Sequence, residues 1–450
     1  MFPPHFHHVR QDVTRHLQRL IQINTTNPPG NEIRVATYLR DVLREEGYEP
    51  LILESAPGRA NLVARLKGTG EKPPLLLMGH TDVVPAEPEH WTHPPFGGEI
   101  HDGYIWGRGA IDMKSLIATQ LVLMVLFKRA QDAGESPLKR DLIWMAAADE
   151  ETGGALGAGW LATHHPELIQ AEYALNEGGG SGYKIGDQVY YSCQTAEKGF
   201  ARFRLTAHGD PGHGAIPHRN MAIVTLAETI SRLGNTPLPL HITETFRLYI
   251  DRVAATQPAD LAKGLQTLLD PHQFDHALAN LPLTPYQKRY LNSMARNTAT
   301  PTILSGGSKI NVIPAEATVQ VDGRILPGFD RADFEHEIRP LLGTDVALEW
   351  LDYGAAMEAP VESPLFEVIT AVMKTHQPDA TVVPLLLTGG TDAKHIASLG
   401  THVYGFAPIL WEENPGLINT VHGHNERISI RALEFGVRTL YEIVYHFCQL

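Results

Sequence analysis

The sequence has few cysteines, no excess of basic residues and no long hydrophobic run. Its two cysteines, Cys193 and Cys448, cannot form a disulfide framework, which favours a reducing compartment. The 37 lysines and arginines are outnumbered by 51 aspartates and glutamates, and the net charge of −14 disfavours nucleic acid or an anionic membrane as a partner. Residues 116–127 form the longest apolar stretch, which is too short to span a bilayer and predicts a buried helix. The first residues lack the basic and apolar regions of a secretory signal, so we expect a cytoplasmic protein.

Signatures of several common enzyme classes are also missing. The sequence contains no His-Glu-x-x-His, no Gly-x-Ser-x-Gly, no Walker loop and no dinucleotide-binding glycine pattern. These absences argue against zincins, serine hydrolases, P-loop enzymes and Rossmann oxidoreductases. With 450 residues, of which 43% are hydrophobic and 20% charged, the chain is large enough for two or three globular cores.

The pattern of hydrophobic residues changes twice along the chain. Apolar strand-like segments such as 141–147 alternate with helical segments in both terminal regions, which predicts an α/β fold with a mostly parallel sheet flanked by helices. Near residue 200 the side chains begin to alternate in character, as in 201–208, which is typical of half-exposed antiparallel strands. We therefore predict a discontinuous catalytic domain, residues 1–198 and 325–450, interrupted by an inserted α+β domain at residues 199–324.

The first motif with chemical character is Met78-Gly-His80-Thr-Asp82, in which an apolar strand ends in His-x-Asp. Ligands of α/β sheets bind beyond the carboxyl ends of the strands. His80 can bind a metal ion through one ring nitrogen while Asp82 accepts the N–H of the other nitrogen, which fixes the tautomer. On its own, the motif is also typical of a polar turn with a hydrogen-bonded histidine.

Four further motifs carry acids or histidines. Gly107-Arg-Gly-Ala-Ile-Asp112 precedes an apolar helix, Asp149-Glu150-Glu151 and Glu177 follow short strands, and His422-Gly-His424-Asn-Glu426 precedes the last helix. Each motif has a simpler interpretation, such as a helix cap or a solvated turn. One ligand from each of the five motifs gives two histidines and three carboxylates, a set that suits a pair of zinc-like ions sharing one carboxylate. These candidate ligands are His80, Asp112, Glu151, Glu177 and His422, with His424 as a rival to His422.

The five ordered motifs resemble those of the co-catalytic di-zinc family of aminoacylase, carboxypeptidase G, acetylornithine deacetylase and succinyl-diaminopimelate desuccinylase. The resemblance begins at Asn27-Pro-Pro-Gly-Asn-Glu32 and covers nearly the whole chain. It implies that Asp112 bridges two Zn²⁺ ions per subunit. The types of ligand favour zinc, and we expect that Co²⁺ or Mn²⁺ can substitute for it. One ion would also bind His80 and Glu177, and the other Glu151 and His422, which the family pattern favours over His424.

The same resemblance implies the catalytic and substrate-binding residues. Glu150 would be the general base that activates the bridging water, Asp82 would orient His80, and the bond from Asp112 to Met113 would be cis. The insert would be a lid that also forms a homodimer and sends His213 to the developing oxyanion in the partner subunit. Arg324 would bind a free carboxylate with its planar guanidinium. Asn311 would assist at the substrate or the oxyanion, and the backbone of Gly389 and Gly390 would line the substrate pocket.

The expected activity is therefore that of a zinc metallopeptidase or amidohydrolase, which cleaves a peptide or N-acyl bond next to a free carboxylate. Carboxypeptidase, dipeptidase and N-acyl-amino-acid hydrolase all fit this description, and the residues do not distinguish the acyl group. We expect a small peptide or N-acyl amino acid as the substrate, and no nucleic acid or membrane as a partner. A two-metal phosphoesterase is the alternative, because paired carboxylate sites also serve phosphoryl transfer. A non-catalytic binding protein on the same scaffold is a third hypothesis, disfavoured because every candidate ligand and Glu150 are present.

Overall fold

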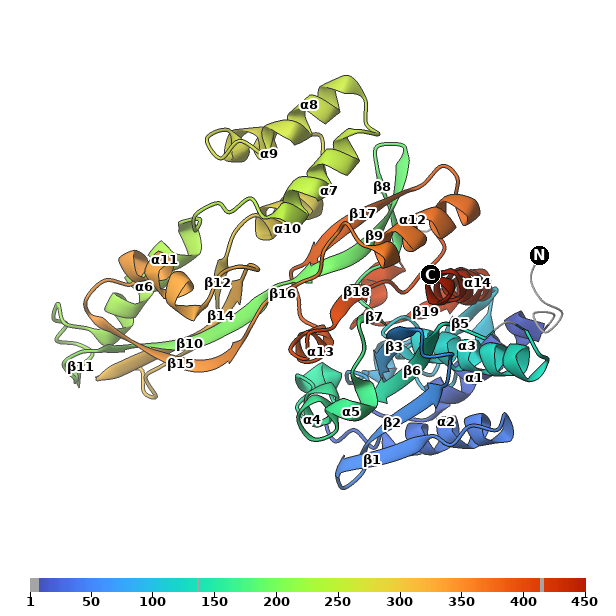
Figure 1. Cartoon of the computed structure of the whole chain (residues 1–450). Coiled ribbons are helices and arrows are strands. Elements are labelled where there is room, and N and C mark those ends of the chain that lie inside the picture. Colours follow the sequence, from blue (N-terminus) through green and yellow to red (C-terminus); the bar gives the residue numbers. More distant parts are fainter. Residues whose placement is uncertain (1–7, 136, 413–416) are drawn as a thin grey trace. The chain divides into compact units, whose positions relative to one another are not determined.

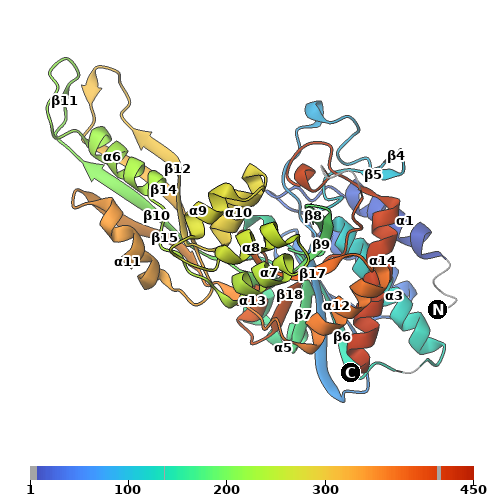
Figure 2. The ribbon, with the colours of Figure 1, turned by 90° about the horizontal axis from the view of Figure 1, so that it is seen from above.

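A computed structural model describes residues 8–135, 137–412 and 417–450. The chain divides into two compact units, coloured along the sequence in Figures 1 and 2. Unit 1 consists of Met1–Thr195, Ala359–Leu385 and Thr391–Leu450, and unit 2 consists of Ala196–Glu358 and Leu386–Gly390. None of the described helices combines the length and apolar character that crossing a membrane requires.

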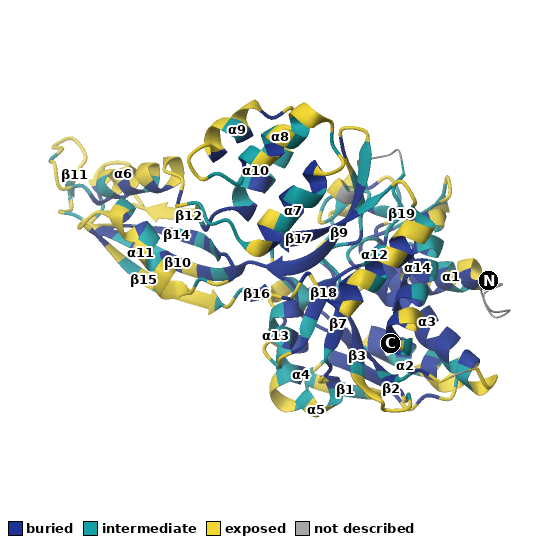
Figure 3. Ribbon diagram, turned by 45° about the horizontal axis from the view of Figure 1, so that its top comes forward, coloured by how far each residue is buried: buried dark blue, intermediate teal, exposed yellow. Residues whose placement is uncertain are grey.

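Unit 1 is built on a mixed sheet in the order β1-β2-β6-β3-β7-β18-β9, with β8 and β17 also paired to β9. The centre of the sheet, from β6 through β3 and β7 to β18, is parallel, and its neighbours on both sides are antiparallel. Figure 3 shows the central strands as buried. The strands are β1 (Leu51–Ala56), β2 (Arg59–Leu66), β3 (Lys72–His80), β6 (Arg140–Ala147), β7 (Tyr173–Asn176), β8 (Gly182–Ile185), β9 (Gln188–Glu197), β17 (Thr381–Leu387) and β18 (His402–Gly405).

Two groups of helices flank this sheet. The first group packs around α3 (Lys114–Asp132), which is buried from Lys114 to Phe127 because most of its side chains are apolar, and the sequence predicted a buried helix over residues 116–127. The second group contacts β6 and β18. The first group also contains α1 (Val9–Gln22), α2 (Ile33–Glu45), α12 (Pro364–His376) and α14 (Ile430–Gln449), and the second contains α4 (Ala158–His164), α5 (Pro166–Ile169) and α13 (Ala393–Ala397).

A separate three-stranded sheet lies within unit 1, in the order β19-β5-β4. Its strands are β4 (Ile100–His101), β5 (Tyr104–Trp106) and β19 (Arg427–Ser429). All its pairs are antiparallel, and Trp106 of β5 lies opposite Arg427 of β19. The sheet thus joins two segments that are more than 300 residues apart in the sequence.

Unit 2 contains a four-stranded antiparallel sheet in the order β12-β14-β10-β15. Side chains of β10 and β14 alternate between buried and less buried, and their buried face packs against α6 and α11 around Phe203, Val321 and Phe334. The elements are β10 (Gly199–His208), α6 (Ala222–Asn235), β12 (Thr298–Gly306), β14 (Glu316–Ile325), α11 (Arg331–Leu342) and β15 (Val346–Gly354).

Three smaller features complete unit 2. Two short strands, β11 (Gly212–His213) and β13 (Val312–Ile313), pair with each other, and β16 (Met357–Glu358) pairs with the end of β9. The region between α6 and β12 is helical, with a core that includes Phe246 and Phe274. Its helices are α7 (Glu244–Ala254), α8 (Ala259–Thr267), α9 (Phe274–Asn280) and α10 (Pro285–Met294).

The structure places the domain boundary later than the predicted residue 324, which lies inside β14. The segment that follows, α11 and β15, looks in the sequence like renewed α/β alternation. However, β15 pairs with β10 along its length and α11 packs against α6, so both belong to unit 2. The insert therefore runs from Ala196 to Glu358, and residues 386–390 belong to it as well.

Candidate metal centre

Two overlapping groups of side chains meet at the carboxyl ends of the parallel strands in unit 1. His80 is the last residue of β3, Glu177 directly follows β7, and Glu151 lies in the turn that follows β6. His80, Asp112 and Glu177 offer ligand atoms within 4.8 Å of one another, and Asp112, Glu151 and His422 do the same. The structure thus brings together all five predicted ligands, with Asp112 common to both groups.

The distances give Asp112 the position of a bridging ligand. Its Oδ1 lies 3.1 Å from Nε2 of His80, and its Oδ2 lies 3.1 Å from Nε2 of His422. Nε2 of His80 is also 3.6 Å from Glu177, and Nε2 of His422 is 3.2 Å from Glu151. Each carboxylate oxygen of Asp112 therefore faces a different histidine.

The rival histidine lies elsewhere. Nε2 of His424 is 2.9 Å from Oε2 of Glu87, in an exposed hydrogen bond outside both groups. His422 reaches the group from a left-handed backbone conformation, with φ of +58°. Such a conformation is uncommon for a residue other than glycine and points to a functional constraint on this position.

The charges of the cluster fit cations. Burial raises the pKa of Glu177 to about 8, with His80 opposing and Asp112 and Glu151 adding to the rise. Burial alone would lower the pKa of His80, but Glu177 and its other carboxylate neighbours raise it well above its usual value. Among the described residues, buried Oε1 of Glu151 has no hydrogen-bond partner. Imidazoles and carboxylates are zinc ligands, so the donor set and this unpaired oxygen suit divalent metal ions.

Glu150 lies beside the cluster and outside both ligand groups, with its Oε2 4.0 Å from Nε2 of His80. Burial raises the pKa of Glu150 well above its usual value, with His80 opposing and Glu177 adding to the rise. A raised pKa makes a carboxylate a better acceptor of a proton and still lets it pass that proton on. Its position and its environment suit the predicted general base.

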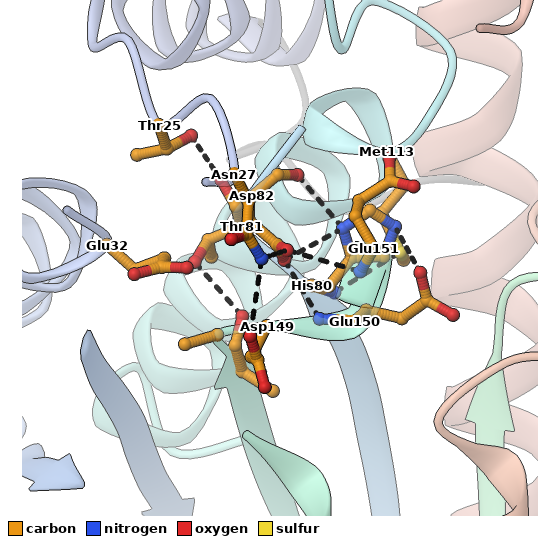
Figure 4. Close-up of polar contacts among 12 residues, drawn as sticks. Thr25, Asn27, Glu32, His80, Thr81, Asp82, Met113, Asp149, Glu150 and Glu151 are labelled. Carbon is orange, nitrogen blue, oxygen red and sulfur yellow. Dashed lines mark hydrogen bonds and ion pairs between the residues drawn. The ribbon is translucent and has the colours of Figure 1, made fainter. Parts of the chain in front are cut away.

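Asp82 contacts both His80 and the loop that carries Glu150 and Glu151 (Figure 4). Nδ1 of His80 lies 3.0 Å from the main-chain oxygen of Asp82 and 3.4 Å from its Oδ1. The Asp82 carboxylate also accepts hydrogen bonds from the backbone N–H groups of Glu150 and Glu151, each at 3.2 Å, and from Nδ2 of Asn27 at 2.8 Å. Asp82 therefore contacts His80 and holds the backbone of Glu150 and Glu151, which adds a contact with the loop to the predicted contact with His80.

Asp149 supports the same loop, a role that could not be predicted from the sequence. The residue has a left-handed backbone, with φ of +73°, directly before Glu150. Its Oδ1 accepts a hydrogen bond from Arg59 at 2.7 Å, and Arg59 also donates to buried Glu32 at 2.8 Å. The Asn27–Glu32 motif signalled this region, but the partners Arg59 and Asp149 depend on the tertiary fold.

Glu426 holds the segment that carries Asp112. Its buried carboxylate accepts hydrogen bonds from the backbone N–H groups of Gly109 at 3.0 Å, Ile111 at 2.7 Å and Asp112 at 3.0 Å. It also accepts a hydrogen bond from Nη1 of Arg108 at 2.7 Å. The bond between Asp112 and the following methionine is cis, as the resemblance implied. Glu426 was visible in the His422 motif, but its hydrogen bonds were not predicted.

Two predicted residues of the insert lie next to each other in unit 2. His213 belongs to β11 and pairs with Val312 of β13, which directly follows Asn311. The N–H of Gly214 donates to the main-chain oxygen of Asn311 at 2.9 Å. Both His213 and Asn311 are exposed. The structure therefore places the two predicted oxyanion and substrate contacts on one small ladder.

Arg324 and the glycine pair form a second group within unit 2. Nε of Arg324 donates to Asp322 at 3.0 Å. A Cβ atom added to Gly390 would lie 4.0 Å from Nη1 of Arg324 and 3.6 Å from Oε1 of Glu197. The backbone of Gly390 therefore lies close to both side chains. A Cβ atom added to Gly389 would have no neighbour within 4 Å.

Lys198 is a further residue near Arg324 that the sequence did not single out. It is buried, its Nζ donates to the main-chain oxygen of Arg296 at 2.6 Å, and burial and the charge of Arg324 lower its pKa to about 7. A second basic side chain therefore adjoins the arginine that is predicted to hold a carboxylate.

Residues 76–446 match the family model for Peptidase family M20/M25/M40. The chain is 29% identical over 406 residues to probable carboxypeptidase S-like 2 of Dictyostelium discoideum, covering 86% of this chain and 73% of that protein. It is 28% identical over 431 residues to N-fatty-acyl-amino acid synthase/hydrolase PM20D1 of Xenopus tropicalis, covering 90% and 79%. It is also 28% identical to aminoacylase-1 of Sus scrofa over 423 residues, covering 91% and 89%.

A solved structure supports the fold. The M20 family metallo-carboxypeptidase Sso-CP2 of Sulfolobus solfataricus superposes with a TM-score of 0.71 at 17% sequence identity, covering 98% of this chain and 100% of that one. The match confirms the expected α/β fold class.

Proposed function

The chain belongs to Peptidase family M20/M25/M40, which makes it a metal-dependent hydrolase, and from that premise we propose that it cleaves a peptide or N-acyl bond next to a free carboxylate. The observation that carries the proposal is the pair of ligand groups sharing Asp112. His80 and Glu177 would complete the site for one Zn²⁺ ion, and Glu151 and His422 the site for the other.

The residues around the cluster supply the remaining chemistry. Bound zinc lowers the pKa of a water molecule and makes hydroxide available near neutral pH. The Glu150 carboxylate would take a proton from the attacking water and later deliver it to the leaving nitrogen, so that the amide and water become an acid and an amine. Asp82 keeps Glu150 in place during this transfer, because it holds the backbone N–H of that residue.

Recognition of the substrate is assigned to unit 2. Arg324 would bind the free carboxylate, which fixes the register of the scissile bond and makes attack nearly intramolecular. His213 would donate a hydrogen bond to the oxyanion as it develops, with Asn311 beside it. The names of the relatives mention a carboxypeptidase, N-fatty-acyl amino acids and an aminoacylase. The proposed substrates are therefore short peptides and N-acyl amino acids.

We also propose that the protein is a homodimer formed through unit 2. The edge strand β12 exposes Ile303 and Leu304, which are 57% and 68% accessible, and α6 beside it exposes Ile223 and Val224. An open edge strand with apolar side chains readily pairs with a second copy, and a two-fold axis would satisfy both edges. His213 would then act in the partner subunit. We also propose a reducing, cytoplasmic location for the protein, because the sequence has only two cysteines.

The first experiment is turnover of a substrate panel by zinc-loaded protein. The panel contains dipeptides and N-acyl amino acids, each paired with its C-terminal amide, and a phosphoester as a further substrate. Cleavage of the free acids and not of the amides is the expected result. Equal cleavage of acids and amides would remove Arg324 from carboxylate binding, and phosphoester cleavage without amide cleavage would overturn the proposed reaction.

Mixing two inactive variants tests the dimer. In a mixed dimer of Glu150→Gln and His213→Ala chains, one site combines an intact Glu150 with an intact His213 from the partner. Activity that neither variant shows alone is expected after mixing and exchange of subunits. If the mixture stays inactive while sedimentation shows mixed dimers, His213 does not act in the partner.

A further inference from the structure

A third group of metal-ligating side chains lies on the small sheet of unit 1, apart from the two groups that share Asp112. His101 belongs to β4, Glu99 stands just before this strand, and His93 lies in the loop that leads to it. Each residue offers one ligand atom, and the three atoms lie within 4.8 Å of one another. The residues have no place in the proposed reaction.

The ligand set has the chemistry of a zinc site. Two imidazoles and one carboxylate, with water in the fourth position, are a recurring set for tetrahedral Zn²⁺. Nε2 of His101 lies 2.7 Å from Oε2 of Glu99, so these two atoms already converge. Both side chains are partly open to solvent, at 38% and 46% accessible, which leaves room for an ion and its water.

The third ligand needs one rotation. The rings of His93 and His101 are stacked, with centroids 3.6 Å apart and planes 7° from parallel. Because the lone pair of an imidazole nitrogen lies in the ring plane, one ring must turn about its Cβ–Cγ bond to face the same ion. The ring of His93 also packs edge-on against Trp106, with the ring centroids 4.7 Å apart. This contact keeps His93 beside His101 and Glu99.

The small sheet that carries this group connects to the two segments that hold Asp112 and His422. Strand β4 pairs with β5, and β5 pairs with β19. Strand β5 continues into the segment that ends at Asp112, and β19 directly follows the segment from His422 to Glu426. An ion bound to the first strand would brace the sheet from which both ligand-bearing segments leave.

We propose that His93, Glu99 and His101 form a separate surface site for a zinc-like divalent ion that stabilises the β4-β5-β19 sheet. The ligands come from two adjacent stretches of chain, so the site needs neither a second subunit nor the catalytic ions. The proposal is therefore independent of the proposed hydrolase activity.

The test counts Zn²⁺ ions on the full-length protein by equilibrium dialysis and elemental analysis. The double variant His93→Ala/His101→Ala is compared with the parent and with the control His164→Ala/His165→Ala. The control removes two histidines from another surface of unit 1, where His165 also lies near a carboxylate, 3.6 Å from Glu167. The expected result is one ion fewer per chain in the first variant and no loss in the control.

A second variant, Glu99→Gln, keeps the side-chain size but removes the anionic ligand. It should lower the affinity of this site for zinc several-fold and reduce the rise in Tm that zinc produces. Turnover of an N-acyl amino acid should stay at the parent level in all three variants. Equal ion counts in the parent and in the His93→Ala/His101→Ala variant would overturn the proposal. Because the readout is a difference between two proteins, it does not depend on how many ions the Asp112 cluster holds or on which substrate is cleaved.

Discussion

The candidate chemistry of unit 1 and the candidate substrate contacts of unit 2 are built in different ways. Among the candidate ligands of unit 1, His80 ends a strand of the buried sheet, and Asp112 and Glu151 stand on segments whose backbone the buried acids Glu426 and Asp82 hold. In unit 2, His213 and Asn311 are exposed on a ladder of two short strands. Groups that must share metal ions within a few ångströms need rigid support, whereas groups that contact a changing substrate can stand on a surface.

This difference predicts separate consequences for substitutions in the two units. Changes at the cluster should abolish chemistry or metal binding, because several groups depend on each support. Changes in unit 2 should leave the metal content intact and alter turnover or substrate affinity. The following measurements test this division.

The largest effect is expected for Glu150→Gln, which removes the candidate base and keeps the shape of the side chain. Turnover should fall by about 10²–10⁴-fold, the usual contribution of a general acid–base group. The zinc content should stay at the parent level, because Glu150 lies outside both ligand groups. Steady-state kinetics and elemental analysis measure both quantities, with the exposed Glu49→Gln as the control. Parent-like turnover would exclude Glu150 as the base.

A somewhat smaller effect is expected for His213→Ala in unit 2. Loss of one hydrogen-bond donor to an oxyanion lowers kcat by about 10²–10³-fold. KM and metal content should change little, because the contact forms mainly in the transition state. The exposed residue His208 at the end of β10 provides a control as His208→Ala. A loss of zinc in His213→Ala would contradict the division between the two units.

Arg324→Gln should act on substrate affinity. A hydrogen bond to a charged group contributes about 1.5–3 kcal/mol, so KM for free-acid substrates should rise by roughly 10–10²-fold. Arg202→Gln is a matched control, because both arginines contact the carboxylate of Asp322, at 3.0 and 3.1 Å. Equal KM changes in the two variants would mean that Arg324 only supports the sheet.

The smallest effect is a pH dependence in the stability of the metal-free protein. The pKa of Glu177 is raised to about 8 by burial, so the folded state keeps a proton that the unfolded chain releases above its ordinary pKa of 4.5. The pKa of His422 is raised to about 10, chiefly by Asp112 and Glu151, which stabilises the folded state below its ordinary pKa of 6.5 and less as pH rises towards 10. Both groups make the metal-free protein less stable as pH increases.

Thermal unfolding with and without zinc measures this dependence. Between about pH 5 and 8, the Tm of the metal-free protein should fall, and the stabilisation by zinc should grow because ions and protons compete for the same ligands. Glu177→Gln should flatten the fall of the metal-free curve. A Tm of the metal-free protein that rises across this range would contradict the assigned charges.

The sequence predicted the cluster because its information is local. Each apolar strand and the ligand after it are adjacent in the chain, so the parallel centre of the sheet and the convergence of His80, Glu151 and Glu177 could be predicted together. The support by Glu426 could not, because its hydrogen bonds join residues more than 300 positions apart. The boundary after residue 324 was misplaced for the same reason, since only the pairing of β15 with β10 shows that α11 and β15 belong to the insert.

The position of Glu426 also orders the events of biosynthesis. Chains fold progressively from the N-terminus as they are made. Asp112 is synthesised more than 300 residues before the acid that fixes its backbone and the histidine that faces its Oδ2. A nascent chain can therefore form the strands next to His80 and Glu177 long before the candidate metal centre is complete. The proposed two-ion site is complete only after the segment from His422 to Glu426 has left the ribosome.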